Sequence, residues 1–170
     1  CVFAGGRPKP SPVIRLFSFL LSKEEVSVRI LWGGDTIDYT VVPVLTSEPA
    51  IRVPHTLPPS PKAQGVLTPV PLIQLAYGRS GDKGDKANIG IIARQSEYLP
   101  YIWAALTPEV VASCFSRFLD GRVERFLLPG IHAINFVLHD VLGGGGIASL
   151  RNDAQGKGYA QILLAQPIDL

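Results

Sequence analysis

Residues 71–94 read PLIQLAYGRSGDKGDKANIGIIAR, and this stretch determines the fold that the sequence predicts. An apolar run over 71–77 leads into a glycine-spaced charged segment, and a second apolar run over 87–94 follows it. The second run is rich in β-branched residues and contains Gly90, which favours a strand over a helix. The first run is short and apolar, as a buried strand is. We therefore expect two strands joined by a charged segment.

The sequence after residue 94 predicts helices mixed with strands. Thr107 and Pro108 supply an N-cap residue and a proline at the first helical position, so a helix is expected to begin here and to end at 120–121. Four further elements are expected: a strand over 123–128, a helix over 131–142 that ends at the glycine run 143–146, and strands over 147–150 and 159–165. Two helices and several strands that can pair antiparallel predict an α+β sandwich, with both helices on one face of the sheet.

The first 47 residues predict β-structure. Apolar and polar residues alternate over 26–32 and 37–41 around the pair Gly33-Gly34, which is typical of a β-hairpin, and 13–21 is rich in β-favouring residues. Eight of the 29 positions from Pro43 to Pro71 are proline, a density that neither a helix interior nor a central strand tolerates. The predicted organisation is a β-rich segment over 1–47, a proline-rich linker over 48–68 and an α+β domain over 69–170.

The overall composition argues against several functional classes. The chain has 16 Lys and Arg against 14 Asp and Glu, and no basic cluster is interleaved with aromatics, so no nucleic-acid partner is expected. The longest apolar stretch, 13–21, is too short to cross a bilayer, which takes about 20 residues, so no membrane partner is expected. The two cysteines, Cys1 and Cys114, are far apart and lack metal-ligand spacing. We expect no metal site and a cytoplasmic location.

The charged segment between the first two strands is the first candidate site. It contains the residues Arg79, Ser80, Gly81, Asp82, Lys83, Gly84 and Asn88. Glycines let backbone N–H groups turn toward an anion, and the cations of such a segment can hold a phosphate or a carboxylate. The same residue types also form ordinary solvated turns between strands. The sequence alone leaves both interpretations open.

The predicted helix over 131–142 carries the second candidate site. His132, Asn135 and His139 fall on one polar stripe of that helix, with the two histidines about 10.5 Å apart along its axis. The alternative is a polar stripe at a helix margin, satisfied by backbone or water. Cys114 lies among apolar residues and is interpreted as a small core residue and not as a nucleophile. We expect the histidine stripe and the charged segment to meet in one ligand site.

Several long motifs resemble the AtuA family, the acyclic terpene utilisation proteins. They are the run 78–94, Tyr98-Leu99-Pro100, Leu106-Thr107, Val123-Glu124-Arg125, the run 128–140 and the run 153–157, with 5–10 and 16–19 before them. The positions that match the family signature are Arg79, Ser80, Gly81, Asp82, Lys83, Gly84, Asn88, Gly90, His132, Asn135 and His139. Lys86 and the run 143–146 depart from it.

The resemblance implies that the last hundred or so residues form the C-terminal AtuA-like domain, which has a ferredoxin-like α+β fold. It also implies a larger preceding domain, of which 1–47 would be the last strands. The family belongs to the catabolism of citronellol- and geraniol-type acyclic terpenoids and related branched acyl-CoA thioesters. It brings no secure reaction assignment and no cofactor, although a CoA thioester is a candidate substrate.

Three functions are expected from these features. The first is an accessory, ligand-binding domain whose partner is the rest of an AtuA-like protein or a separate chain that carries the N-terminal domain. The second is an acyl-CoA hydratase or lyase, with His132 or His139 as general base and with Arg79 and Lys83 holding a carboxylate or a CoA phosphate. The third is an assembly module that forms homo-oligomers. Because the chain has no methionine and begins with Cys1, we expect it to be one part of a longer or split protein.

Overall fold

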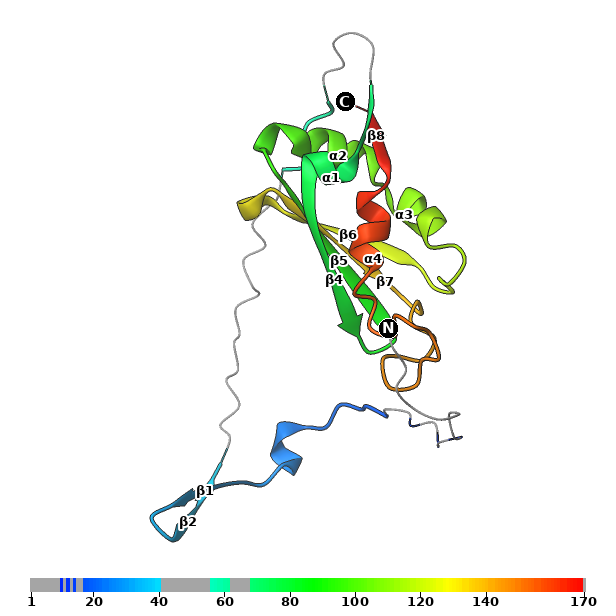
Figure 1. Cartoon of the computed structure of the whole chain (residues 1–170). Coiled ribbons are helices and arrows are strands. Elements are labelled where there is room, and N and C mark those ends of the chain that lie inside the picture. Colours follow the sequence, from blue (N-terminus) through cyan, green and yellow to red (C-terminus); the bar gives the residue numbers. More distant parts are fainter. Residues whose placement is uncertain are drawn as a thin grey trace. The chain divides into compact units, whose positions relative to one another are not determined.

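A computed structural model of the chain describes residues 10, 12, 14, 17–40, 56–61 and 68–169. The chain divides into two units, one comprising Leu16–Pro54 and the other comprising Cys1–Arg15 with His55–Leu170 (Figure 1). Most of the predicted linker over 48–68 lies outside the described residues.

The smaller unit contains the predicted β-hairpin. Strands β1 (Val28–Trp32) and β2 (Asp35–Tyr39) pair antiparallel after the short 3-10 helix η1 (Lys23–Glu25). Gly33 and Gly34 have φ of +58° and +94°, the left-handed conformation that a two-residue hairpin turn requires. A strand was also expected over 13–21, and this prediction is wrong: none of its described residues, 14 and 17–21, belongs to a strand. Every residue of β1 and β2 is exposed, so the hairpin buries no side chain of its own.

The larger unit is built on one four-stranded antiparallel sheet. Its strands are β4 (Ala76–Lys83), β5 (Lys86–Ala93), β6 (Val123–Leu128) and β7 (Ala133–Leu138), in the order β4-β5-β7-β6. Its helices are α1 (Leu72–Leu75), α2 (Leu99–Ala105), α3 (Pro108–Cys114) and α4 (Tyr159–Leu164), with 3-10 turns η2 (Ser96–Tyr98) and η3 (Pro129–Ile131). A second, two-stranded sheet pairs β3 (Pro69–Pro71) with β8 (Pro167–Asp169).

The connections between these strands are those of a ferredoxin-like sandwich. Strands β5 and β6 run parallel with β7 between them, and α2 and α3 connect them, which makes a split βαβ unit. β7 and β4 are likewise parallel with β5 between them, and α4 follows β7. No chain segment runs from α4 into β4, because β4 comes first in the sequence. The residues before β4 and after α4 are nevertheless joined, by the pairing of β3 with β8 and by a hydrogen bond of 2.8 Å from Leu72 N to Gln166 O. The predicted α+β class and ferredoxin-like fold are therefore confirmed.

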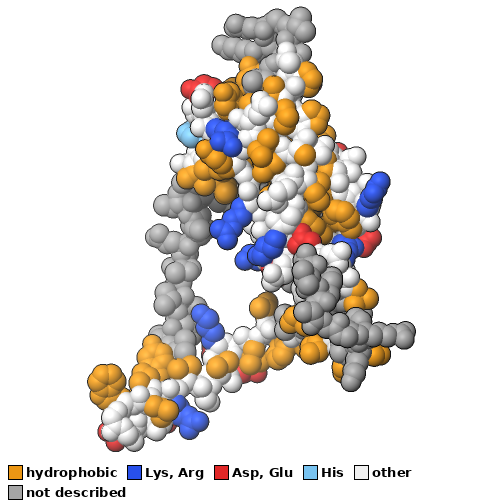
Figure 2. All heavy atoms as spheres, in the orientation of Figure 1, with side chains coloured by type: hydrophobic (Ala, Val, Ile, Leu, Met, Phe, Trp, Pro, Cys, Tyr) orange, Lys and Arg blue, Asp and Glu red, His pale blue; other side chains and the backbone are white. Residues whose placement is uncertain are grey.

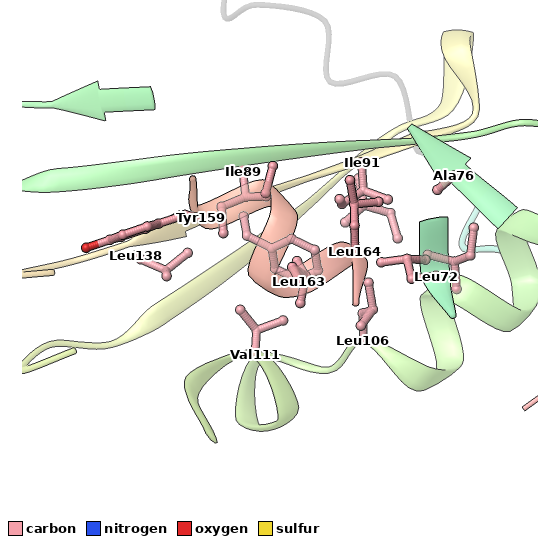
Figure 3. Close-up of a cluster of buried hydrophobic side chains, with 14 of the residues drawn as sticks. Leu72, Ala76, Ile89, Ile91, Leu106, Val111, Leu138, Tyr159, Leu163 and Leu164 are labelled. Carbon is pink, nitrogen blue, oxygen red and sulfur yellow. The ribbon is translucent and has the colours of Figure 1, made fainter. Parts of the chain in front are cut away.

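The core fills the space between the sheet and its helices. Figure 3 shows Ile89 and Ile91 of β5 pointing toward Leu163 and Leu164 of α4, with Val111 of α3 on the other side of α4. Helix α4 approaches the sheet closely because β4 has glycine at the contact. A Cβ added at Gly78 would lie 3.0 Å from a methyl carbon of Leu164. Burying the apolar side chains of this layer contributes about 25 cal/mol per Å² of surface removed from water.

Several local expectations are confirmed. The Thr107 hydroxyl accepts a hydrogen bond from Val110 N at 3.3 Å and caps α3 as predicted, although the helix ends at Cys114 and not near 120. The strand over 123–128 is also confirmed. The strand expected over 87–94 is β5.

Other predicted elements are wrong, mainly because the spacing of apolar residues fitted both a helix and a strand. The expected helix over 131–142 is strand β7, in which the buried Ile134, Phe136 and Leu138 alternate with half-buried residues. The expected strand over 159–165 is helix α4, because its buried residues recur at helical spacing. Residues 147–150 form a turn and not a strand, and the strand expected from 71 begins at Ala76, after one helical turn at Leu72–Leu75.

The described surface carries mixed charges. On the face that Figure 2 shows, Lys and Arg side chains stand in separate small groups among hydrophobic ones, without a continuous basic surface. None of the helices formed by the described residues has the length and apolar character needed to cross a bilayer.

Candidate functional site

The sheet of the larger unit has its helices α2, α3 and α4 on one face, and none of the described α-helices of that unit covers the other face (Figure 1). Side chains on alternate positions of each strand face the core, as Ile89, Phe136 and Leu138 do, so the intervening residues face the other way. We call this second surface the open face. By alternation its residues are Tyr77, Arg79, Gly81 and Lys83 of β4, Lys86, Asn88, Gly90 and Ile92 of β5, Ala133, Asn135 and Val137 of β7, and Glu124, Phe126 and Leu128 of β6.

Two glycines make a bare area of backbone in the middle of the open face. Gly81 lies opposite Asn88, and Gly90 lies between Arg79 on β4 and Asn135 on β7. A Cβ added at Gly90 would meet only the carbonyl oxygen of Arg79, at 3.8 Å. The Nδ2 of Asn88 donates to Oδ1 of Asn135 at 3.5 Å. Polar side chains therefore surround half-buried backbone, with room for a side chain above Gly90.

A lysine from a distant segment joins this area. A Cβ added at Gly81 would lie 3.3 Å from Nζ of Lys157 and 4.0 Å from Oδ1 of Asn88, so the ammonium group rests against the bare backbone of Gly81. We call the set of Arg79, Asn88, Asn135 and Lys157 around the two glycines the polar cluster. Lys157 was not among the candidate site residues predicted from the sequence. The glycine on each side of it and its place in the run 153–157 were the only local signals.

The backbone of Lys157 is fixed by two side chains. Its N–H donates to Oδ1 of Asp153 at 2.8 Å, and the next N–H, of Gly158, donates to Oδ2 of the same carboxylate at 2.8 Å. The hydroxyl of Ser80 donates to the carbonyl oxygen of Lys157 at 3.1 Å. The lysine is therefore held against the edge strand through its backbone, and its ammonium group lies 3.9 Å from Oδ1 of Asp82.

An apolar depression adjoins the polar cluster. It has a volume of about 310 Å³ and is lined by residues that include Tyr77, Gly90, Ile92, Leu128, Ile131 and Ala133. Arg79 lies at its margin, and the exposed fractions of Tyr77 (57%) and Ile131 (57%) show that the depression opens to solvent. A ligand on the open face would thus meet an apolar surface at one end and polar groups at the other.

The predicted charged loop is mostly a regular hairpin. β4 continues to Lys83 and β5 starts at Lys86, so only Gly84 and Asp85 form the turn, with φ of +67° at Gly84. Ser80 faces the core and is 7% exposed, and its Oγ also accepts from Ala160 N at 2.9 Å. Oδ1 of Asp85 accepts from the N–H groups of Leu142 and Gly144 at 3.2 and 2.8 Å. These two side chains hold the segment after β7 against the sheet.

The structure separates the two histidines of the predicted stripe. His132 is exposed in the left-handed conformation, φ 51°, just before β7, whereas His139 follows the other end of that strand. In an extended chain seven residues span about 23 Å, more than twice the helical distance. His132 and His139 therefore do not share one site. Asn135 is the residue of the stripe that lies in the polar cluster.

His139 has its own carboxylate partner. Its Nε2 lies 2.6 Å from Oε2 of Glu124 on the neighbouring strand, and Oε1 of Glu124 accepts from Arg122 at 3.0 Å. The hydrogen bond from His139, followed by that from Arg122, lowers the pKa of Glu124 below its usual value. The His139 side chain is 14% exposed and that of Glu124 is 36% exposed. This pair lies about 13 Å along β7 from Asn135, outside the polar cluster.

A second cavity lies on the helical side, and several of its lining groups make hydrogen bonds within the fold. It has a volume of about 620 Å³ beside α4 and includes Phe118, Arg151 and Tyr159 in its lining. The Arg151 guanidinium donates to the carbonyl oxygens of Phe118 and Val141, and the Tyr159 hydroxyl donates to Val141 O at 3.1 Å.

Burial raises the pKa of the Cys114 thiol, so this cysteine is a poor nucleophile. Within the described ranges, no cluster of three or more His, Cys, Asp or Glu side chains is placed to hold a metal ion.

Comparison with known proteins identifies the larger unit. A family model described as the AtuA ferredoxin-like domain matches residues 70–169, which is more than half of the chain. No curated protein and no solved structure matches the chain.

Proposed function

The chain belongs to the AtuA ferredoxin-like domain family, which is linked to acyclic terpene utilisation, and on this premise we propose that it is an accessory, ligand-binding domain of a larger protein. Its ligand would be an acyclic terpenoid, citronellol- or geraniol-type, or a related branched acyl compound. Its partner would be the N-terminal domain of an AtuA-like protein, on the same chain or on a separate one.

The open face is the observation that supports this proposal. Its depression is apolar, has a volume of about 310 Å³ and borders the polar cluster at Gly90 and Arg79. Small-molecule sites combine apolar walls with a few polar groups that fix orientation, and the open face has both. An acyclic terpenoid acyl group has the same two parts, a branched hydrocarbon chain and a polar carbonyl end.

Titration calorimetry of the chain with geranic acid tests this proposal. Gly90→Val places a branched side chain in the depression, and its Cβ would have no contact closer than the carbonyl oxygen of Arg79 at 3.8 Å. Because filling a hydrophobic pocket by a few carbon atoms costs binding energy, we expect affinity to fall by about tenfold or more. Val110→Ile, at an exposed position of α3 on the helical side, is the control and should bind like the wild type. Wild-type protein that binds no geranic acid would refute the proposal.

The pair formed by Glu124 and His139 favours a second candidate function, an acyl-CoA hydratase or lyase. A carboxylate 2.6 Å from a histidine nitrogen orients the ring, as a general base requires. In protein that includes the larger N-terminal domain, His139→Ala should then lower turnover of branched acyl-CoA substrates by about tenfold or more. His132→Ala is the control, because His132 lies exposed at the far end of β7 without such a partner among the described residues. Equal rates for His139→Ala and wild type would exclude this role for His139.

A further inference from the structure

We propose that Lys157 recognises an anionic group at the polar end of the ligand, a carboxylate or a phosphate, while the hydrocarbon chain occupies the apolar depression. This inference deepens the proposed function and rests on it. It concerns the ligand class: the open face would select acids or acyl esters of an anionic carrier over the neutral terpenoid alcohols.

The charge of Lys157 is incompletely satisfied within the fold. Its nearest carboxylate oxygen, Oδ1 of Asp82, lies 3.9 Å from Nζ, which is longer than the 2.7–3.2 Å of an N–H···O hydrogen bond. In the part of the chain that the structure describes, Nζ has no hydrogen-bond acceptor. An ammonium group carries three donors, so Lys157 keeps its hydrogen-bonding capacity for a ligand. Its side chain is 60% exposed and therefore accessible.

The backbone that carries Lys157 is fixed before any ligand arrives. Asp153 and Ser80 fix the backbone of Lys157 on both sides of the peptide unit. The missing side chain at Gly81 then lets Nζ come to rest on the edge strand, at a place where a Cβ would lie 3.3 Å away. A side chain on a fixed backbone loses less conformational freedom on binding, which favours affinity.

The neighbours of Lys157 suit an anion that offers two oxygen atoms to hydrogen-bond donors. Arg79 lies on the same face of β4 two residues from Gly81, about 7 Å along the strand. It is exposed, and no carboxylate pairs with it among the described residues. A guanidinium group binds a carboxylate or a phosphate through two parallel hydrogen bonds. The amide groups of Asn88 and Asn135 lie beside the same bare backbone and add further donors.

The order of these groups along the open face orients the ligand. Lys157 and Gly81 stand nearest the hairpin turn, Arg79 and Gly90 come next, and the depression continues toward Tyr77 and Ile92. An amphipathic anion fits this order with its charged end toward the turn. A neutral alcohol of the same chain would fill the depression equally well but would gain no charge-assisted hydrogen bond.

Titration calorimetry of the full chain with geranic acid and geraniol tests the inference, because these two probes share one hydrocarbon chain and differ in the polar end. Lys157→Met removes the charge and preserves the length of the side chain and its backbone hydrogen bonds. We expect it to weaken geranic acid binding by about tenfold or more, the range for a hydrogen bond to a charged group, and to leave geraniol binding within about twofold. Gly81→Ala, which displaces only the flexible end of Lys157, should weaken geranic acid binding by a smaller factor.

Arg117→Gln provides the charge-matched control. Arg117 is exposed and lies beside the cavity on the helical side, so its loss should leave both affinities unchanged. Raising NaCl from about 50 mM to about 500 mM should weaken binding of the acid and spare that of the alcohol. Titrations with CoA alone and with geranyl-CoA identify the anion: binding of CoA alone points to its phosphates, and binding of the free acid points to the carboxylate.

The outcomes separate the two proposals. If wild-type protein binds both geranic acid and geraniol but Lys157→Met binds the acid equally well, the inference about Lys157 is refuted and the ligand-binding function stands. If wild-type protein binds none of the probes, the proposed function fails and the inference fails with it. Circular dichroism of each variant must match the wild type, and if Lys157→Met unfolds, the comparison of Gly81→Ala with wild type decides.

Discussion

Replacing Ser80 by alanine distinguishes a residue of the fold from a residue of the ligand site. Ser80 belongs to the signature run and was a predicted ligand-binding residue, yet it is 7% exposed and faces the core. Its Oγ donates to Lys157 O at 3.1 Å and accepts from Ala160 N at 2.9 Å. Both hydrogen bonds join β4 to the segment that enters α4. Ser80→Ala should therefore destabilise the larger unit.

The magnitude follows from the group that is left without a partner. The bond to Ala160 N is buried, so the alanine variant leaves a buried N–H unpaired, which costs about 1–3 kcal/mol. The carbonyl oxygen of Lys157 is less buried and can find water, so its loss adds little. We expect a decrease of about 2 kcal/mol in the free energy of unfolding. With a urea slope of about 1–3 kcal/mol per M, the denaturation midpoint should fall by about 1 M.

Urea denaturation followed by tryptophan fluorescence measures this change. The chain has two tryptophans, and Trp32→Phe leaves Trp103, on α2, as the reporter for the larger unit. Ser96→Ala, an exposed serine at the start of η2, is the matched control and should stay within about 0.5 kcal/mol of the parent. A Ser80→Ala variant as stable as this control would show that the hydroxyl does not anchor α4, and the structural interpretation of Ser80 would have to be abandoned.

Two further predictions concern the segment around β6 and β7. Gly121→Ala should lower the melting temperature by about 5 °C or more, because a Cβ there would lie 2.6 Å from the carbonyl oxygen of His139, whereas Gly130→Ala, with nothing within 4 Å, should be nearly neutral; equal melting temperatures would contradict the close contact. Glu124→Gln should flatten the loss of stability between about pH 5 and pH 3. The folded-state pKa of Glu124 is lowered, so its stabilisation is complete above the unfolded-state value of about 4.3 and disappears as the pH falls through the folded value. Parallel pH profiles of the free energy of unfolding would argue against the contribution of the pair.

The elements that the sequence predicted correctly depend on local chemistry. The cap at Thr107 requires only one hydroxyl and an N–H three residues later, and the hairpin of the smaller unit requires only Gly33 and Gly34 between alternating residues. Both can be recognised within a few positions of the chain. The α+β class requires only that helices and strands alternate in a mixture that can pair antiparallel. It can therefore be predicted correctly even when some single elements are assigned wrongly.

The wrong assignments come from residues whose partners are distant. Ile131, Ile134 and Leu138 satisfy a helical spacing, and Ile134, Phe136 and Leu138 satisfy a strand spacing, so periodicity alone could not decide. Pairing decides, because β7 lies between β5 and β6 and hydrogen-bonds to both. The four glycines over 143–146 were expected to end a helix. In the structure they lie in a loop whose backbone is held by Asp85, 57 and 59 residues earlier than its two donors.

The candidate site was found only in part for the same reason. The sequence pointed to Arg79, Asn88 and Asn135, which the sheet register brings onto one face, but it attached them to a loop and a helix. Lys157 could not be found by spacing, since it is 77 residues from Ser80, to whose hydroxyl it is bonded. The histidines were grouped on a helical stripe that does not exist. The pairing register of the strands decides which residues are neighbours on a sheet, and a single sequence does not reveal that register.

The connectivity of the fold explains how such distant residues meet on β4. Among the described strands of the larger unit, β3 is the first and β8 is the last, and their pairing closes the crossover that would otherwise run from α4 to β4. Residues 153–158 lie just before α4, so they arrive at the edge of β4, where Ser80 fixes the backbone of Lys157 and Gly81 admits its side chain. The polar cluster thus draws on the first strand of the sheet and on a segment near the end of the unit. A ligand held between Arg79 and Lys157 would connect β4 to the segment that precedes α4. Its binding should therefore increase the free energy of unfolding of the larger unit.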